Sequence, residues 1–259
     1  MTPEPPEPRK LEPRVVRAGN RGAFTLDGTR TFLVGRRQVA VIDPGPDLDT
    51  HVRALSSALS GASEIRILLT HHHSDHAGAA RALAESLGAP VYGPPSTGSL
   101  PLTAGQRIST DEGDLAVVDT PGHTRDHLAF HWLDAEALFA GDLLLGRGST
   151  TWLGEYPGCV ADYLASLDRV ESLAPQVVYP SHGNPVRRVP VVIGVYRKHR
   201  LDRLHQLARA LEEHPGASPE TLMEVVYGRT LPERLSKAAG ASIRVMLHHL
   251  ERAEEVERG

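Results

Sequence analysis

The stretch Ile65-Arg66-Ile67-Leu68-Leu69-Thr70-His71-His72-His73-Ser74-Asp75-His76 decides the fold of this chain. It opens with a nearly continuous apolar run, which is typical of a buried strand. Four histidines and one aspartate then follow within six residues. Residues i and i+2 leaving a strand point the same way, so His71 and His73 can bind one metal ion. Asp75 and His76 come one turn later, where the chain enters a helix, and can face a second ion. Imidazole and carboxylate are suitable ligands for Zn²⁺ and related ions.

The composition agrees with an imidazole-based metal site in a globular protein. The chain has 259 residues, of which 40% are hydrophobic and 23% charged, so it can bury a sizeable core and is not disordered throughout. Its one cysteine, Cys159, excludes an intramolecular disulfide framework and zinc sites built from several cysteines. The 14 histidines leave imidazole and carboxylate as the metal ligands.

Charge and hydropathy give no sign of a nucleic-acid or membrane protein. The net charge is -4, from 28 basic and 32 acidic side chains, so there is no overall basic field. No run reaches the roughly 18 apolar residues that a membrane span needs. Met1–Pro13 holds five prolines and no apolar signal segment. We therefore expect a flexible proline-rich tail over residues 1–14 and a cytoplasmic protein without a membrane partner.

Alternating strands and helices occupy most of the chain. The apolar runs predict strands at 31–34, 39–42, 65–69, 91–92, 115–118, 128–132, 137–140 and 177–179. Helical spacing predicts helices at 50–60, 77–87 and 161–173. This alternation indicates an α/β fold.

The pattern changes to helices alone after Pro185. We expect a long amphipathic helix over 191–214, a short helix begun by Ser218-Pro219 and running through Val226, and a last helix over 231–255. Residues 191–259 carry 11 Lys/Arg and 10 Asp/Glu, a charge of +1 that leaves -5 on the rest. The sequence predicts a small C-terminal helical domain here.

Three further strand ends carry candidate ligands. His123 lies in Thr120-Pro121-Gly122-His123-Thr124, Asp142 follows Gly141, and His182 follows Ser181. A single aspartate or histidine at such a place is more often a turn former. Together with His71–His76 they predict a shared pocket at one edge of a sheet.

These motifs resemble those of the metallo-β-lactamase superfamily. Val41-Ile42-Asp43-Pro44-Gly45, Leu68-Leu69-Thr70, Phe139-Ala140-Gly141-Asp142 and Tyr179-Pro180-Ser181-His182-Gly183 fall in the superfamily's order, over about residues 15–190. Asp126-His127 and Gly146–Thr151 look like the beta-lactamase-like protein 2 branch. The resemblance implies an αβ/βα four-layer sandwich as the hydrolase domain, residues 15–190, and a winged-helix-like domain over 191–259.

The resemblance also implies the ligands and the chemistry. One divalent metal ion would be held by His71, His73 and His123, and the other by Asp75, His76 and His182, with Asp142 bridging both. The ions would share a hydroxide that attacks the substrate. Asp75 would orient it and pass a proton to the leaving group. Zn²⁺ is the first expectation, with Mn²⁺ and Fe²⁺ as alternatives.

Other residues near these motifs have lesser roles in this interpretation. His127 is a candidate catalytic residue that either touches the substrate or supports a ligand. Ser149, Thr150 and Thr151 are candidate substrate-binding residues. His72 and Cys159 are not expected to act. Arg30, Ser181 and Asn184 stand where the branch has Asn, Gly and Pro, and none of these departures removes a ligand.

Three functions remain open from the sequence. The first is a phosphodiesterase acting on single-stranded RNA, as the branch implies. The second is a small-molecule hydrolase of a thioester, lactone or β-lactam, and the third is a non-catalytic or dimerising module with a structural metal. A basic groove leading from the metals to the C-terminal helices would favour RNA, and a closed apolar pocket would favour a small acyl substrate. A homodimer is also left open.

Overall fold

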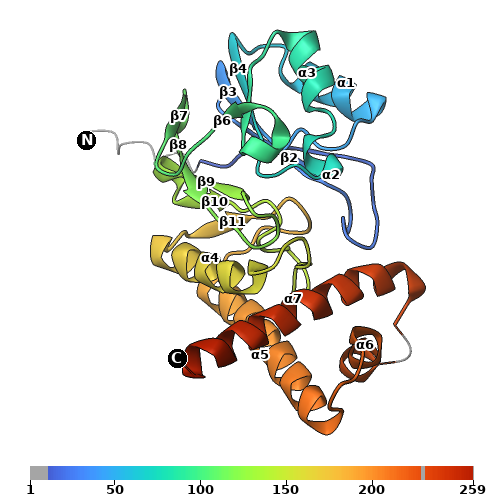
Figure 1. The fold of residues 1–259 in the computed structure, drawn as a ribbon. Helices are drawn as coiled ribbons and strands as arrows, with labels where there is room; N and C mark the ends of the chain where they lie inside the picture. Colours follow the sequence, from blue (N-terminus) through green and yellow to red (C-terminus); the bar gives the residue numbers. More distant parts are fainter. Residues whose placement is uncertain (1–10, 229–230, 259) are drawn as a thin grey trace.

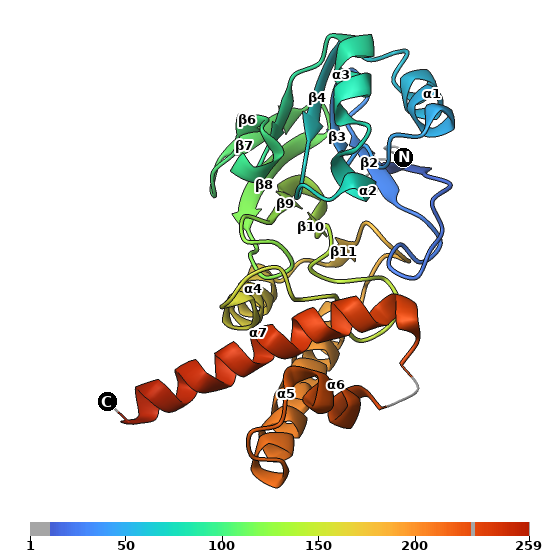
Figure 2. The ribbon, with the colours of Figure 1, turned by 45° about the vertical axis from the view of Figure 1, so that its right-hand side comes forward.

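Two sheets lie at the centre of the protein (Figures 1 and 2). The computed structural model describes residues 11–228 and 231–258. The first sheet has the order β1-β2-β3-β4-β5-β6 and the second the order β11-β10-β9-β8-β7. The strands of the first are β1 (Arg14–Arg17), β2 (Arg30–Val34), β3 (Gln38–Ile42), β4 (Glu64–Leu68), β5 (Val91–Gly93) and β6 (Leu100–Pro101). Those of the second are β7 (Arg107–Thr110), β8 (Gly113–Asp119), β9 (Leu128–Trp132), β10 (Ala137–Phe139) and β11 (Val177–Tyr179).

Helices cover the outer face of each sheet. The helices are α1 (Asp49–Ala58), α2 (Ser74–Ala77), α3 (Ala80–Leu87), α4 (Cys159–Leu173), α5 (Val189–Glu213), α6 (Pro219–Tyr227) and α7 (Glu233–Arg258). Leu55 of α1 and Leu83 of α3 pack on the outer face of the first sheet, and Phe32, Phe130 and Phe139 lie between the two sheets. Leu167 of α4 packs outside the second sheet. This is the αβ/βα layering predicted from the sequence, and it is confirmed.

Each expected strand is present, but three strands were not expected. β1 starts at Arg14, the last residue of the predicted tail, and pairs with β2; residues 1–10 of that tail lie outside the described part of the chain. β6 and β7 are edge strands of two and four residues. Such short segments carry too few residues for a period-2 signal.

The helix predicted over 77–87 was wrong in its extent. The main helix of this segment, α3, begins only at Ala80, and a short helix, α2, precedes it and ends at Ala77, with Gly78 and Ala79 between them. Backbone hydrogen bonds join Gly45 N–H to the His76 carbonyl (2.9 Å) and Ala79 N–H to the Gly45 carbonyl (2.9 Å). The chain after β3 therefore sits against this junction. Only glycine fits at 78, because a Cβ there would lie 2.4 Å from the Ser74 carbonyl oxygen.

The three C-terminal helices pack as one body against α4. Ser218 begins α6 as expected, since its hydroxyl accepts a hydrogen bond from Thr221 N–H. Within the described residues no strand follows β11, so a β-wing has no counterpart there. Ile193 and Tyr196 of α5 share one apolar cluster with Tyr163 of α4. The cluster is thus continuous across residue 190, and the domain boundary stays a prediction.

A helix that crosses a bilayer needs about 20 mainly apolar residues. In residues 11–228 and 231–258, none of the helices is long and apolar enough to cross a membrane.

Candidate metal centre

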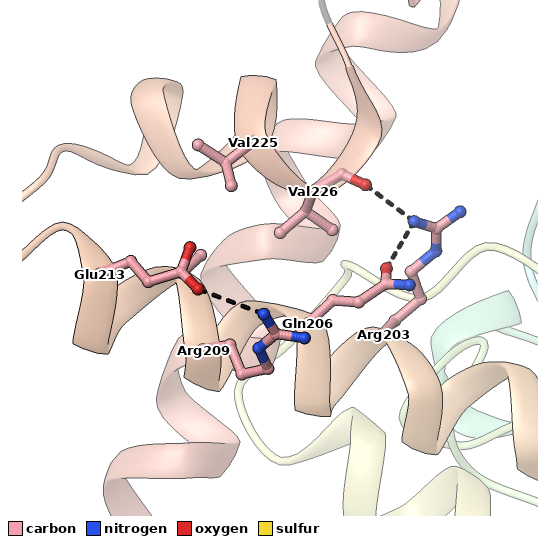
Figure 3. Close-up of a pocket in the computed structure, with 7 residues that line it drawn as sticks. Arg203, Gln206, Arg209, Glu213, Val225 and Val226 are labelled. Atoms are coloured by element: carbon pink, nitrogen blue, oxygen red, sulfur yellow. Dashed lines mark hydrogen bonds and ion pairs between the residues drawn. The ribbon is translucent and has the colours of Figure 1, made fainter.

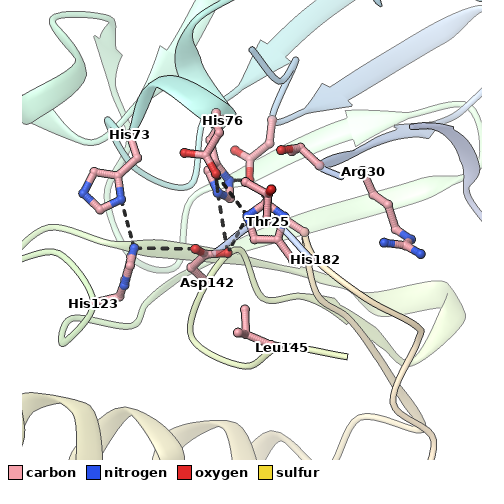
Figure 4. A network of polar contacts seen from close by, with 12 residues as sticks. Thr25, Arg30, His73, His76, His123, Asp142, Leu145 and His182 are labelled. Carbon is pink, nitrogen blue, oxygen red and sulfur yellow. Dashed lines mark hydrogen bonds and ion pairs between the residues drawn. The ribbon is translucent and has the colours of Figure 1, made fainter. Parts of the chain in front are cut away.

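Four segments that follow strands of the two sheets bring the candidate ligands together (Figure 4). β3 and β4 are parallel with Ile42 opposite Leu68, so the loops after these strands meet at one edge. In the second sheet Phe139 of β10 lies opposite Tyr179 of β11, again in parallel. Asp142 lies three residues after the end of β10, and His182 lies three residues after the end of β11. The loop between β8 and β9 carries His123.

The first group consists of His71, His73 and His123. Their ligand atoms all lie within 4.8 Å of one another. Nδ1 of His73 is 3.0 Å from Nε2 of His123. His71 and His123 are buried, whereas His73 is half-buried. Three imidazoles converge here from two different sheets, as the ligands of a structural or catalytic metal ion do.

The second group consists of Asp75, His76 and His182. Oδ2 of Asp75 is 3.2 Å from Nε2 of His182 and 3.6 Å from Nε2 of His76. Both histidines are fully buried, and the Asp75 side chain is 28% exposed. Asp75 is therefore the member of this group that solvent reaches.

Asp142 lies between the two groups and faces each with a different oxygen. Its Oδ1 is 3.4 Å from Nε2 of His182 and 3.5 Å from Nε2 of His76. Its Oδ2 is 3.6 Å from Nε2 of His123. These separations are longer than a hydrogen bond between the same atoms. They leave room for a cation on either side of one carboxylate.

The buried polar atoms of the site fit a metal. Nε2 of His71, His76 and His182 and Oδ1 of Asp142 are all buried without a hydrogen-bond partner. Such atoms are rare in folded proteins because the desolvation cost is not recovered. All four point into the same small volume, and each is a good metal ligand. The donor set thus suits two divalent cations.

Asp43 accepts hydrogen bonds from three residues in the loops that carry the candidate ligands. Its Oδ1 accepts a hydrogen bond from Thr70 N–H (2.8 Å), and its Oδ2 accepts from the Thr70 hydroxyl (2.8 Å), His76 Nδ1 (2.8 Å) and the Ser181 hydroxyl (3.0 Å). Because Nδ1–H of His76 donates to this carboxylate, Nε2 is the ring nitrogen left to bind a metal ion. Thr70 Oγ1 also lies 2.9 Å from Nδ1 of His71, which leaves Nε2 of that residue free in the same way.

The electrostatics of the cluster keep Asp142 ionised. Burial alone would raise the pKa of Asp142, but His182 and His76 hold it well below its ordinary value. In His71, burial and the nearby His76 keep the pKa well below the usual range. Burial likewise lowers the pKa of His73 to about 4, with His123 adding to the effect. The neutral imidazoles of His71 and His73 and the ionised Asp142 are the protonation states that a metal requires. Burial alone would lower the pKa of His76, but Asp142 and Asp43 hold it well above its ordinary value, so a metal ion would displace a proton from this ring.

His127 lies beside the cluster but does not open toward a substrate. It is buried, its Nδ1 is 2.8 Å from the Thr120 hydroxyl, and its Nε2 accepts a hydrogen bond from Asp142 N–H (3.3 Å). Both ring nitrogens are therefore used within the protein. Of the two roles predicted for His127, this geometry favours support of a ligand over contact with the substrate.

The predicted substrate-binding residues lie against α5. Ser149 Oγ is 3.4 Å from His199 Nδ1, and Arg200 donates to the Thr150 hydroxyl (3.3 Å) and the Thr151 carbonyl (3.0 Å). These contacts hold the loop in place, so a role in binding substrate stays a prediction. Trp152 was not predicted from the sequence as part of the site. Its carbonyl accepts a hydrogen bond from His123 Nδ1 (2.9 Å), and its ring flanks His73 and His123.

Asp43 and Ser181 also had no role in the sequence analysis. Asp43 belongs to a motif that marks the family, but a strand-end aspartate gives no sign of the side chains that it accepts from. Ser181 was seen as a departure from the usual glycine. Its hydroxyl is one of the donors to Asp43. His72 Nε2 lies 3.9 Å from a carboxylate oxygen of Glu155, and His72, His73 and Glu155 form a further group whose ligand atoms lie within 4.8 Å of one another. That His72 is not a ligand of the two main groups stays a prediction.

The fold and the His/Asp cluster define a metal-dependent hydrolase. Residues 25–115 and 98–182 match the family model of the metallo-beta-lactamase superfamily. The chain is 33% identical to the atrochrysone carboxyl ACP thioesterase of Aspergillus chevalieri over 90% of this chain and 79% of that protein. It is 31% identical to the beta-lactamase-like protein 2 homolog of Caenorhabditis elegans over 89% of this chain and 81% of that protein.

The solved structures agree with the sequence matches. A beta-lactamase domain protein from Burkholderia ambifaria superimposes with a TM-score of 0.82 at 23% identity, covering 94% of this chain and 86% of that one. This likeness shows the fold. The chain belongs to the metallo-β-lactamase superfamily, as the sequence motifs predict.

Proposed function

We propose that this chain hydrolyses a thioester with two divalent metal ions. His71, His73 and His123 would hold one ion, and Asp75, His76 and His182 would hold the other, with Asp142 available to both. The observation that carries the proposal is the position of Asp142, whose two oxygens face the two groups at 3.4 and 3.6 Å. Zn²⁺ is the first choice for such ligands, and Mn²⁺ and Fe²⁺ suit the same donors.

The bound ions would supply a water of lowered pKa and would polarise the bond under attack. The protein side chains do the rest. Asp75 is the more exposed of the two carboxylates, 28% against 12% for Asp142, and it is the one that can reach the attacking water. Its pKa lies below the ordinary value because His182 and His76 outweigh the effect of burial. It is thus ionised at neutral pH and able to accept a proton.

Hydrolysis of the thioester uses one water molecule and yields a carboxylic acid and a thiol. The water oxygen attacks the carbonyl carbon, Asp75 takes the released proton, and the carbon–sulfur bond breaks. The sulfur leaves as a thiolate and takes the proton from Asp75. A thiol has a pKa near 8.5, so it leaves with little help from an acid.

Two observations support a thioester as the substrate. One relative that aligns over most of its length is a thioesterase by name, and it covers 90% of this chain. In addition, the half-buried Trp152 lies beside the first histidine group, with its ring centroid 6.0 Å from that of His123 and 6.3 Å from that of His73. It offers an apolar wall for an acyl group next to the reacting centre.

A phosphodiester, with single-stranded RNA as the substrate, is the second candidate. It is favoured by Asp142 between the two groups, because carboxylate-bridged pairs of metals are common in phosphatases and nucleases. The groove between α5 and α6 holds Arg203 and Arg209, but Arg203 donates to the Val226 carbonyl and Arg209 pairs with Glu213 (Figure 3). None of the residues that line this groove belongs to the metal centre, and in both ribbon views α7 passes between α2 and α6.

A substrate panel separates these candidates. Metal-free protein is loaded with Zn²⁺ or Mn²⁺ and given an acyl thioester, a lactone, a cephalosporin, bis-p-nitrophenyl phosphate and single-stranded RNA. We expect the thioester to be cleaved fastest and Asp75→Asn to lose at least 100-fold in rate. The exposed Asp47→Asn serves as the matched control. Cleavage of RNA alone would select the second candidate, and activity that survives in Asp75→Asn would contradict the mechanism.

A further inference from the structure

The segment 145–153, which follows Asp142 in the chain, is held by the C-terminal helices. The Tyr196 hydroxyl of α5 donates to the Leu145 carbonyl and accepts from Leu145 N–H, both at 3.0 Å. Ser242 of α7 donates to the Leu153 carbonyl at 2.6 Å. Trp152 Nε1–H donates to the Ala238 carbonyl of α7 at 3.1 Å. Ala238 and Ser242 are four residues apart in α7, so one face of this helix makes both contacts.

Arg200 makes the central contact from α5. Its side chain is almost completely buried, at 4% exposure, and its guanidinium donates to the Thr151 carbonyl and the Thr150 hydroxyl. The guanidinium carbon also lies 5.6 Å from the ring centroid of Tyr163. A buried cation is costly unless acceptors surround it, so this side chain restricts where the backbone of Thr151 can lie.

Trp152, the residue after Thr151, connects this segment to the candidate metal ligand His123. The Trp152 carbonyl lies 2.9 Å from Nδ1 of His123. A carbonyl oxygen can only accept, so Nδ1 must carry the proton, and the Nε2 lone pair is directed at Asp142 and His73. The position of this carbonyl therefore sets both the tautomer and the ring orientation of His123.

We infer that Arg200 and Ser242 are positioning residues for the His71/His73/His123 group. They act through the segment 145–153, whose Trp152 carbonyl fixes His123. The helices after residue 189 thereby tune one metal position without contributing a ligand to it. This inference rests on the proposed function only for His123 as a ligand.

The first readout needs no metal. In metal-free protein labelled with ¹⁵N, long-range proton–nitrogen spectra report which ring nitrogen of each histidine carries the proton, with His123→Asn used to assign the signal. We expect wild-type His123 to be protonated at Nδ1. In Arg200→Met and Ser242→Ala we expect a mixture of both tautomers, and in Arg200→Lys, which keeps one donor, a partial return to Nδ1.

The second readout is zinc affinity, measured by competition with a chromophoric chelator. The expected result is that one of two equivalents binds roughly 10-fold more weakly in Arg200→Met and in Ser242→Ala, while the other is unchanged. Arg203→Met is the matched control, because Arg203 lies one turn further along α5 and contacts α6 instead. Thermal unfolding of each variant identifies any that fails to fold, and Ser242→Ala is the milder change.

The outcomes separate the inference from the proposed function. A wild-type protein that binds no zinc would overturn the proposed ligands, while the tautomer of His123 would still decide the inference. An unchanged tautomer and zinc affinities within twofold of wild type in both folded variants would overturn the inference.

Discussion

Asp43 and His76 form a buried pair, with Oδ2 of Asp43 2.8 Å from Nδ1 of His76 and neither side chain exposed to solvent. The two residues are 33 positions apart in sequence, and the parallel pairing of β3 with β4 brings them together. The pair fixes the orientation of the His76 ring, and with it the direction of Nε2, before any metal binds. The cluster is therefore preorganised by its own hydrogen bonds.

Asp43→Asn tests this preorganisation. The amide keeps the size of the side chain, and asparagine tolerates the positive φ of +50° at this position. It presents only one acceptor oxygen to the four donors, so the His76 ring loses its fixed orientation. We expect zinc affinity to fall by roughly 10- to 100-fold, measured by chelator competition. Asp47→Asn should bind zinc as wild type does, and equal affinity in the two variants would contradict the role of Asp43.

Ser181→Ala removes one of the donors to Asp43. The hydroxyl is buried, and its loss should lower the free energy of unfolding by about 1 kcal/mol. Urea denaturation of the metal-free protein measures this directly. Ser172→Ala, in which the lost hydroxyl is exposed and bonds only within its own helix, should change stability far less. If Ser181→Ala matched that control, the hydrogen bond to Asp43 would have no net value.

Gly141→Ala should disturb the residues that support Asp142. The φ of Gly141 is +50°, and a Cβ there would lie 2.6 Å from Nε2 of His127 and 2.7 Å from the Thr70 hydroxyl oxygen. Backbone strain and the clash together should cost about 3 kcal/mol or more in the free energy of unfolding. Gly98→Ala is the control, because its φ is +67° but nothing lies within 4 Å of the added Cβ. Equal losses in the two variants would show that strain alone acts.

The buried His127 should make the free energy of unfolding fall as the pH is lowered. Burial lowers the pKa of His127 to about 3, well under its value of 6.5 in an unfolded chain. As the pH falls below 6.5 the unfolded state takes up a proton that the folded state refuses, so stability is lost on acidification. Between pH 7.5 and 5.0 this costs about 2 kcal/mol.

The measurement compares wild type with His127→Gln in metal-free protein. Glutamine can still accept from Asp142 N–H and donate to Thr120, but it does not titrate. Urea unfolding at the two pH values should therefore show a loss about 2 kcal/mol smaller in the variant. The same loss in both proteins would mean that His127 is not a source of the pH dependence.

Zinc should stabilise the folded protein because the ligands converge only in that state. At a free concentration 100 times Kd, each site adds about 2.7 kcal/mol, which corresponds to a rise of roughly 5–10 °C in Tm. Scanning calorimetry with and without a chelator measures the rise. Asp142→Asn, which weakens both sites, should show a much smaller rise. A Tm that zinc does not move would argue against the ligand set.

The sequence was sufficient to predict the layers of the fold and the residues that converge. Buried strands such as 65–69 and 128–132 carry long apolar runs, and every predicted ligand follows the end of one of the expected strands. β6, with only Leu100 and Pro101, has no such signal, and its pairing with β5 depends on tertiary structure. The break between α2 and α3 was also missed, because it results from Gly45, which lies more than 30 residues earlier.

The supporting contacts of the site were beyond sequence reasoning for a related reason. Trp152 and His123 are 29 residues apart, and their contact is made by a backbone carbonyl that any residue type could provide. Arg200 reads as one more basic residue of an amphipathic helix. Its burial against Thr151 depends on how α5 packs, which no local pattern encodes.

Each group of candidate ligands combines residues from loops of the first sheet with residues from loops of the second. His71, Asp75 and His76 follow a strand of the first sheet, whereas His123, Asp142 and His182 follow strands of the second. With these ligands, the first group and Asp142 are complete on a ribosome-bound chain only after residue 142 has emerged, and the second group only after residue 182, and both need the two sheets to have closed on each other. The metal ions would then bind only after the chain has folded, and each ion would connect loops of the first sheet to loops of the second.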